Sequence, residues 1–341
     1  MPTRDRATMA PYLDGVRVLE IGNEQGDYCG RVLAGMGAEV VKVEPPRGEV
    51  TRSYGPFYHD TPHPDRSLYY WHYNLGKRSV VLDVDTPAGQ AKLIHLAAIA
   101  DVVIDSRPWG FLEARGAGYD TLRERNRGLV YVKITPFGAD GPWADYQGSD
   151  LIHLALGGVV VNCGYDPDPA LEYRTPPVAP QMWHSYHITG EMATMSVLAA
   201  LSYRHETGTG QHIDLAVHDA VSKNSETDIP DWIARAQDHY RRTCSHSVTA
   251  EGGGFSAVSS LSRTQDGRWL LPYRAYGWMK GFVDGWPGTL DLLRRYGMQA
   301  DLDEPVYEDL AYRSKPAAAM HITDAVDNLV GRLPFDQDLS R

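Results

Sequence analysis

Three glycines follow the first apolar run of the sequence, and the next apolar run ends in an acid. VRVLEI is followed by Gly22, Gly26 and Gly30, and Glu44 closes EVVKVE. In dinucleotide-binding proteins, a carboxylate at this place holds a ribose hydroxyl. The glycines are four residues apart, however, which is not the GxGxxG spacing. A nicotinamide-dependent oxidoreductase therefore remains only an alternative hypothesis.

Five histidines crowd one region, namely His184, His187, His205, His212 and His218. The first two lie three residues apart at a predicted helix start, a spacing that could place both on one face for a metal. No carboxylate or thiolate completes a ligand set at the usual spacing, so we predict no metal site. The absence of a GxSxG motif also argues against a serine hydrolase.

Several cations lie near the ends of predicted strands. Lys77 and Arg78 open a strand after the turn NLG, and Arg107 and Arg115 flank the helix after DVVIDS. Ligands bind at the carboxyl ends of parallel strands, so these cations could bind phosphates. Solvated surface charge is the alternative interpretation.

An alternation of strands and helices positions these residues. SVVLDVD, a helix over 86–100, DVVIDS, a helix over about 111–126 and LVYVKI continue the pattern of the first unit. Apolar strands alternating with helices predict an α/β fold with a doubly wound, Rossmann-like, mostly parallel sheet. The stretch 186–204 is apolar on almost every face and predicts a buried helix.

The composition changes after the strand QHIDLAV, which places a domain boundary near Asn224. We expect a large domain over 1–223 and a linker with a smaller α+β domain over 224–341. Asp266-Gly267 predicts a hairpin in the second part. The consecutive glycines 252–254 are compatible with either a linker or a mobile flap.

Bulk composition excludes several classes of partner. The chain has 341 residues, 43% of them hydrophobic, and a formal net charge of -11, and no run of Lys or Arg exceeds a pair. These values argue against nucleic acid and anionic membranes as partners. Three cysteines without CxxC spacing, no signal-like segment and no long apolar run predict a cytoplasmic protein.

Long segments of the chain closely resemble family III CoA transferases, the group of formyl-CoA transferase and carnitine-CoA transferase. They include CGRVLAGMGAEVVKVEPPRGEVTR, NLGKRSVVLDVDTPAGQ and VLAALSYRHETGTGQHIDLAVHDAV, and together span roughly 13–222. The resemblance implies a Rossmann-like large domain and an interlocked dimer. It also implies transfer of CoA between an acyl-CoA and a carboxylic acid, with coenzyme A as substrate and no tightly bound cofactor.

The resemblance also places residues at the site. The family's aspartate attacks the thioester, a form of covalent nucleophilic catalysis, and amides near a glycine flap, here Gly252, Gly253 and Gly254, would stabilise oxyanions. Ser106 and Arg107 stand where the family has an Asn-Phe pair beside the adenine. The expected CoA-binding residues are Gln25, Lys77, Arg78, Ser106, Arg107, Arg115 and Phe137.

The nucleophile departs from the family pattern. Tyr186 stands where the family has its aspartate, and a phenol with a pKa near 10 replaces a carboxylate poorly. Three side chains are candidates to act instead: His187, Asp150 and Glu191. Asp150 could also be a helix N-cap, and Glu191 points about 140° away from Tyr186 on a regular helix. The histidine of the related racemases is replaced by Ser149.

Two versions of the function follow. The chain is either an active transferase with a displaced nucleophile or a non-catalytic subunit that pairs with a catalytic paralogue, so a homodimer and a heteromer are both expected. Family members continue past the point where this sequence ends. The small domain is therefore expected to be shortened, or to be completed by another chain.

Overall fold

A computed structural model describes most of the chain, and the statements below concern residues 11–165, 172–223, 228–236, 239–242, 245–249, 262–270, 285–313 and 315–333. The chain forms two compact units, Met1–Gly158 with Pro180–Ser225 and Val159–Ala179 with Glu226–Arg341. Residues 159–179 thus group with the second unit. The domain limit after residue 223 remains a prediction.

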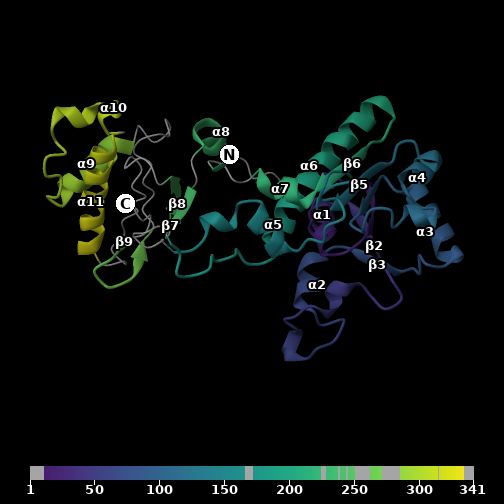
Figure 1. Ribbon diagram of the computed structural model, residues 1–341. Helices are drawn as coiled ribbons and strands as arrows, with labels where there is room; N and C mark the ends of the chain where they lie inside the picture. The colour runs from purple at the N-terminus through teal and green to yellow at the C-terminus, as the bar shows by residue number, and fades with distance from the viewer. Residues whose placement is uncertain are drawn as a thin grey trace, which may run out of the picture. The chain divides into compact units, whose positions relative to one another are not determined.

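The first unit is built on a six-stranded parallel sheet (Figure 1). Its strands, in spatial order, are β3 (Arg78–Val81), β2 (Glu39–Glu44), β1 (Arg17–Ile21), β4 (Val102–Asp105), β5 (Val130–Thr135) and β6 (His212–Ala216). Every pairing between neighbours is parallel. The order reverses at β1, as in a doubly wound sheet, so the predicted fold class is confirmed.

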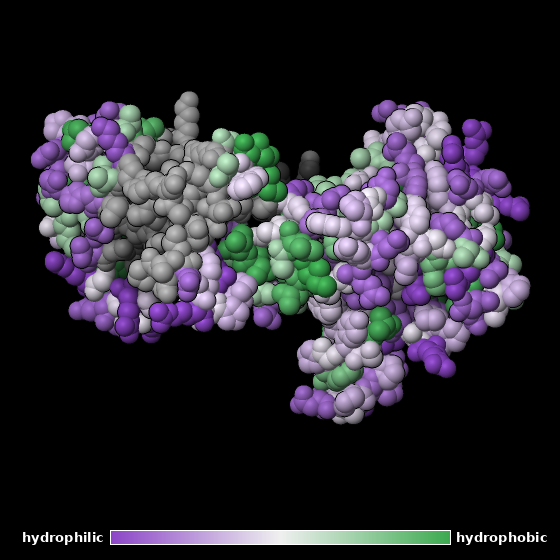
Figure 2. Space-filling view, viewed as in Figure 1, coloured by the Kyte–Doolittle hydropathy of each residue, from purple (hydrophilic) through white to green (hydrophobic). Residues whose placement is uncertain are grey.

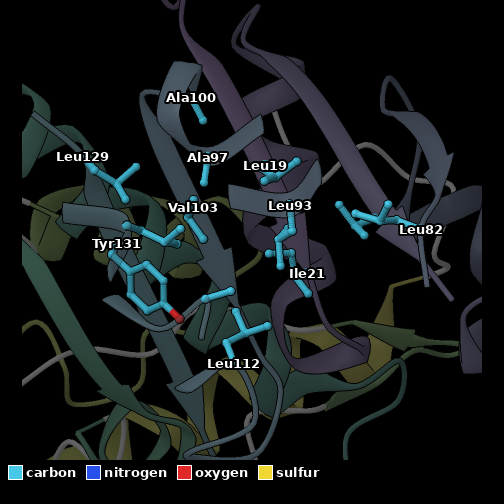
Figure 3. Packing of buried hydrophobic residues seen from close by; sticks show 13 residues of the cluster. Leu19, Ile21, Leu82, Leu93, Ala97, Ala100, Val103, Leu112, Leu129 and Tyr131 are labelled. Carbon is cyan, nitrogen blue, oxygen red and sulfur yellow. The ribbon is translucent and has the colours of Figure 1, made fainter. Parts of the chain in front are cut away.

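One face of the sheet packs on α3 (Pro87–Ile99) and α4 (Tyr119–Arg125). Alternate strand residues point to this side, because side chains along a strand face opposite sides in turn. They meet Leu93 and Ala97 of α3 in a buried apolar cluster (Figure 3). Cluster members from the strands include Leu19, Ile21, Val43, Val103 and Tyr131. This core holds the carboxyl ends of the central strands in place.

The other face packs on α1 (Glu24–Gly35) and α6 (His184–Thr207), which also lie against each other. The buried side of α6 is a stripe of small residues that includes Thr189, Gly190, Ala193 and Val197. The prediction of a buried helix is confirmed for one side of α6 only. Met195 is 58% exposed and Glu191 is exposed as well, so only one side of α6 meets the sheet.

Shorter elements surround this framework. They are η2 (Val50–Ser53), η3 (Tyr58–Asp60), α2 (Leu68–Tyr73), η4 (Glu113–Arg115), α5 (Asp150–Leu156) and α7 (Val217–Ser222). The single helix expected over 111–126 is instead η4 followed by α4. Gly116, in the left-handed region at φ 68°, ends the first piece, because glycine adopts this conformation without steric cost.

The second unit combines short strands and helices. Its elements are η5 (Val160–Asn162), α8 (Asp228–Arg235), β7 (His239–Arg242), β8 (Ser245–Thr249), β9 (Ser262–Arg263), β10 (Trp269–Leu270), α9 (Gly285–Arg295), η7 (Pro305–Glu308), α10 (Leu310–Arg313) and α11 (Pro316–Arg332). Trp286, Leu293 and Ile322 belong to its core. The predicted hairpin is confirmed, since β9 and β10 pair antiparallel around Gly267.

Two further expectations concern flexibility and membranes. The proposed flap Gly252–Gly254 lies outside the described residues. Among the residues that the structure describes, no helix is long and apolar enough to cross a membrane.

Candidate functional site

The loops after β1 and β4 meet at the point where the strand order reverses. Ser106, which follows β4, accepts a hydrogen bond at Oγ from the backbone N–H of Asn23, at 2.9 Å. A Cβ on Gly22 would overlap this hydroxyl, so only glycine allows the two loops to approach so closely. Ligands of doubly wound sheets bind outside the carboxyl ends of the strands at such a point. Ser106 is therefore a buried packing residue beneath the expected site.

Helix α1 begins at this crevice with two polar side chains that are incompletely satisfied. Asn23 is its N-cap and accepts from the N–H of Gln25. Gln25 is 9% exposed, and its buried Oε1 has no partner. Glu24 Oε1 lies 3.5 Å from the hydroxyl of Tyr54, while its buried Oε2 has no partner. Buried polar atoms usually find partners, so these two oxygens point to a water or ligand.

Aromatic rings line the same region. Trp183 stacks on Tyr54 with ring centroids 5.8 Å apart and on Tyr186 at 5.6 Å. Tyr69 meets Tyr54 edge to face at 5.4 Å, and its buried hydroxyl also has no partner. Helix α2 thus contributes a third polar atom to the set. The rings of Tyr54, Tyr69, Trp183 and Tyr186 together form an aromatic wall, and Glu24 lies at its edge.

Tyr186 lies at the start of α6 and is 1% exposed. Burial raises the pKa of its phenol, and the carboxylates of Glu24 and Asp150 raise it further. The phenol is therefore neutral at physiological pH. A neutral phenol cannot replace an ionised carboxylate as a nucleophile toward a thioester.

Asp150 does not cap its own helix, contrary to the expected N-cap role. Ser149 is the N-cap of α5 and accepts from the N–H of Ile152. Asp150 Oδ1 instead accepts from the N–H of Ser185, at 2.9 Å, and from its hydroxyl, at 2.6 Å. Trp183, the N-cap residue of α6, makes no side-chain capping bond. Asp150 therefore caps α6 from outside and orients the turn that carries Tyr186.

Replacing Asp150 by alanine is expected to lower the free energy of unfolding by roughly 0.5–2 kcal/mol, as loss of a helix cap does. Asp150→Asn keeps an acceptor oxygen and should recover most of this loss. Urea unfolding of both variants checks the prediction. An asparagine variant as unstable as the alanine variant would show that the charge, and not the cap, is what matters.

The other two candidate catalytic residues are His187 and Glu191. His187 Nε2 lies 2.7 Å from the hydroxyl of Tyr73, and its ring lies 4.4 Å from that of Tyr28. Burial lowers the pKa of His187, and the nearby His184 lowers it further. Glu191 is exposed, on the side of α6 away from the buried Tyr186.

Lys77 is engaged in a buried ion network that the sequence analysis missed. Its ammonium contacts Glu20 (2.9 Å to Oε1), the carbonyl oxygen of Asp27 (2.8 Å) and Asn74 Oδ1 (2.9 Å). Lys42 contacts Glu20 (2.9 Å) and the Asp27 carboxylate in the same network. Charged residues inside the apolar runs of β1 and β2 were the available signal. Lys77 would have to leave these partners to reach a phosphate.

The three arginines lie in different surroundings. Arg78 is at the amino end of β3, where it pairs with Glu39, away from the carboxyl edge. Arg107 and Arg115 stack on Phe111 from 4.3 and 3.7 Å. Arg115 also pairs with Asp85, and the buried Arg107 Nε has no partner. The last two are the cations that the structure places next to the loops after β3 and β4.

Phe137 belongs to a second aromatic group beside the wall. Its ring lies 5.1 Å from His153 and 5.6 Å from His218, and His153 lies 6.4 Å from Tyr186. Both ring nitrogens of His153 are buried without partners, and burial lowers its pKa to about 4. Sequence analysis did not single out His153. Among the described residues, no group of three His, Cys, Asp or Glu side chains could hold a metal ion.

The ribose contact of the nicotinamide alternative is not available. Glu44 accepts hydrogen bonds from Arg52, Tyr70 and Ser79. Burial would raise the pKa of Glu44, but these hydrogen bonds lower it to about 2. The carboxylate is therefore committed to contacts within the protein.

The chain is similar to several characterised proteins. It is 34% identical over 277 residues to succinyl-CoA:(R)-benzylsuccinate CoA-transferase subunit BbsE of Thauera aromatica, covering 80% of this chain and 65% of that protein. It is 33% identical to a succinyl-CoA:mesaconate CoA-transferase of Haloarcula hispanica, covering 75% of this chain and 65% of the relative. The chain thus spans just under two thirds of these relatives.

Two solved structures are also similar to this chain. A CAIB/BAIF family protein from Brucella suis has a TM-score of 0.72 and 28% identity, over 97% of this chain and 81% of that one. Rv3272 of Mycobacterium tuberculosis has a TM-score of 0.71 and 27% identity, over 94% and 78% of the two chains. The profile of CoA-transferase family III matches residues 13–273. The chain therefore belongs to CoA-transferase family III.

Proposed function

We propose that the chain moves CoA between an acyl-CoA and a carboxylic acid, with the acyl-CoA bound at the carboxyl ends of β1 and β4. The observation that carries the proposal is the set of buried, unpartnered oxygens at this crevice, in a chain of this family. They belong to Glu24, Gln25 and Tyr69. The carbonyl oxygen of a bound thioester would accept a hydrogen bond from the Tyr69 hydroxyl, and amide N–H groups of the pantetheine arm would donate to the oxygens of Glu24 and Gln25.

The nucleotide end of CoA would reach the loops that carry Arg107 and Arg115. Their stacking on Phe111 holds both guanidinium groups in place, and the unpartnered Arg107 Nε offers a donor to a phosphate. Phe137 would contact the acyl or pantetheine part from the second aromatic group. Lys77 and Arg78 are less suited, because their charges are already paired.

A dimer remains part of the proposal. Leu151, Ile152 and Leu156 of α5 are 57%, 42% and 54% exposed, and apolar atoms gather over this helix in Figure 2. This side of α5 is therefore exposed in the single chain. Exposed apolar patches commonly mark contacts between proteins. A second protomer, identical or paralogous, would cover them.

The non-catalytic subunit is the second candidate function. It is favoured by Tyr186, which stands at the family's aspartate position and stays neutral through burial. The relative from Thauera aromatica is named as a subunit. On this version, the chain would bind CoA but need a catalytic partner for transfer.

Transfer by the isolated protein separates the two versions. The chain is incubated with succinyl-CoA and a carboxylic acid such as mesaconate, and new acyl-CoA is measured by mass spectrometry. We expect a new thioester, and coenzyme A should raise the melting temperature through binding to the native state. Stabilisation by coenzyme A without transfer would favour the subunit version. Stabilisation by NADH alone would contradict both.

A further inference from the structure

A carboxylate with an unused oxygen lies at the other end of the ring stack that reaches Tyr186. Glu24 and Asp150 are the two acids whose charges raise the pKa of the Tyr186 phenol. Oδ1 of Asp150 is committed to the cap of α6 through Ser185. Oε2 of Glu24 is buried and has no partner, and Oε1 has only the long 3.5 Å contact with Tyr54. Of these two acids, Glu24 is the one whose carboxylate can approach a substrate without breaking a helix cap.

The surroundings of Glu24 fit a reacting thioester. Three rings, those of Tyr54, Trp183 and Tyr186, form a continuous stack that runs from Glu24 to the start of α6. The next residue is Gln25, which the resemblance gives as a CoA-binding residue and whose Oε1 is unpartnered. Position and chemistry thus coincide at the first turn of α1.

We propose that Glu24 is the nucleophile of this chain, in place of the carboxylate that Tyr186 has displaced. The inference rests on the proposed transferase function and deepens it. It differs from every candidate that the sequence indicated, because Glu24 comes from α1 and not from α5 or α6. The nucleophile would thus come from α1 in this chain instead of α6, while the thioester would still react between these two helices.

The bonds balance without an oxidant or a further co-reactant. An oxygen of the Glu24 carboxylate attacks the thioester carbon, the carbon–sulfur bond breaks, and CoA thiolate leaves a mixed anhydride. The thiolate then attacks the glutamyl carbon, which releases the donor acid and forms a glutamyl-CoA thioester. The acceptor carboxylate and the returning thiolate repeat these two steps in reverse order. Acceptor-CoA leaves, and Glu24 regains its carboxylate.

The environment of Glu24 supports this role. Burial raises the pKa of Glu24, and the charge of Asp27 raises it further, while the hydrogen bond from Tyr54 and the charge of Lys42 lower it. A carboxylate that is poorly solvated and more basic than usual is a better nucleophile once it is ionised. The neutral Tyr186 at the other end of the ring stack adds no competing negative charge.

A covalent adduct identifies the nucleophile directly. Wild-type protein is incubated with succinyl-CoA without acceptor, digested with trypsin, and searched for CoA on the peptide of residues 18–31. Fragmentation distinguishes Glu24 from Glu20 and Asp27 on that peptide. We expect the adduct on Glu24. An adduct on Asp150, Glu191 or any other residue would overturn the inference and leave the transferase function standing.

Glu24→Gln gives the second measurement. The amide keeps the shape and cannot form the anhydride, so transfer should fall more than about a thousandfold, as removal of a covalent nucleophile does. Glu124→Gln on the exposed side of α4 is the matched control and should keep full activity. Equal activity of Glu24→Gln and wild type would refute the role of Glu24 alone. Absence of both transfer and adduct in wild type would contradict the transferase function of the isolated chain as well. Should Glu24→Gln not fold, the wild-type peptide decides.

Discussion

Replacing Lys42 by methionine is expected to destabilise the first unit by about 3–5 kcal/mol. The side chain of Lys42 is 1% exposed and contacts both Glu20 and Asp27, whose side chains are 1% and 0% exposed. Burial by itself would lower the pKa of Lys42, but the two acids raise it well above its usual value. Removing one member of a buried ion pair leaves the other charge unpaired, and the loss is of this size.

Urea unfolding measures the loss, and Lys92→Met serves as the control. Lys92 lies on the exposed side of α3, so its replacement should change the free energy of unfolding by less than about 0.5 kcal/mol. Lys77 still reaches Glu20 in the Lys42 variant, but the Asp27 carboxylate then keeps no cation at hydrogen-bond distance except through movement of Lys77. A loss below about 1 kcal/mol would show that the network relaxes or takes up water.

Alanine at Gly190 is expected to lower the free energy of unfolding by roughly 1–3 kcal/mol. Gly190 lies where α6 crosses α1, and an added Cβ would come within 2.9 Å of the backbone nitrogen of Cys29 and of two carbons of Tyr28. Real Cβ atoms do not approach backbone so closely, and overpacking of a helix contact costs this amount. The two helices must separate, which also shifts the turn that carries Tyr186.

Gly35→Ala is the matched control for this variant. Gly35 is also in a helix, and nothing lies within 4 Å of its added Cβ. Alanine there should leave stability unchanged or raise it by up to about 1 kcal/mol, because alanine forms helices better than glycine. Thermal melting of the two variants side by side checks the pair. Equal melting temperatures would contradict the close packing of α1 on α6.

The strands of the first unit are largely predictable from local pattern. Short apolar, β-branched runs were assigned to β1, β2, β4, β5 and β6 within one or two residues of their observed bounds. Such runs bury both faces in a parallel sheet, so composition alone reports them. The prediction of one helix over 111–126 was wrong because Gly116 and Gly118 interrupt it. The spacing of apolar residues does not report the backbone conformation of a single glycine.

The candidate site is less predictable, because its residues come from distant segments. Glu24 lies next to Gln25, which the resemblance singled out, yet the sequence does not show that the ring of Tyr54 and the start of α6 meet there. The charge of Lys77 was compatible with phosphate binding or with a solvated surface position, whereas in the structure it contacts Glu20 and the carbonyl oxygen of Asp27. Glu20 and Asp27 lie 57 and 50 residues from Lys77 in the sequence, so local pattern does not reveal these contacts.

The sequence by itself determined the fold class and the family, because these follow from local runs and from residue identities, and it led to the prediction that Tyr186 replaces the family's aspartate. Only the tertiary structure decided which of these acids has a buried carboxylate oxygen without a hydrogen-bond partner. Asp150 accepts the capping hydrogen bonds of α6, Glu191 is exposed, and the half-buried Glu24 has a buried oxygen without a partner at the end of the aromatic stack. Hydrogen-bond partners and burial arise only when helices and strands pack together. Carboxylates of the same type therefore differ in reactivity only in the folded protein.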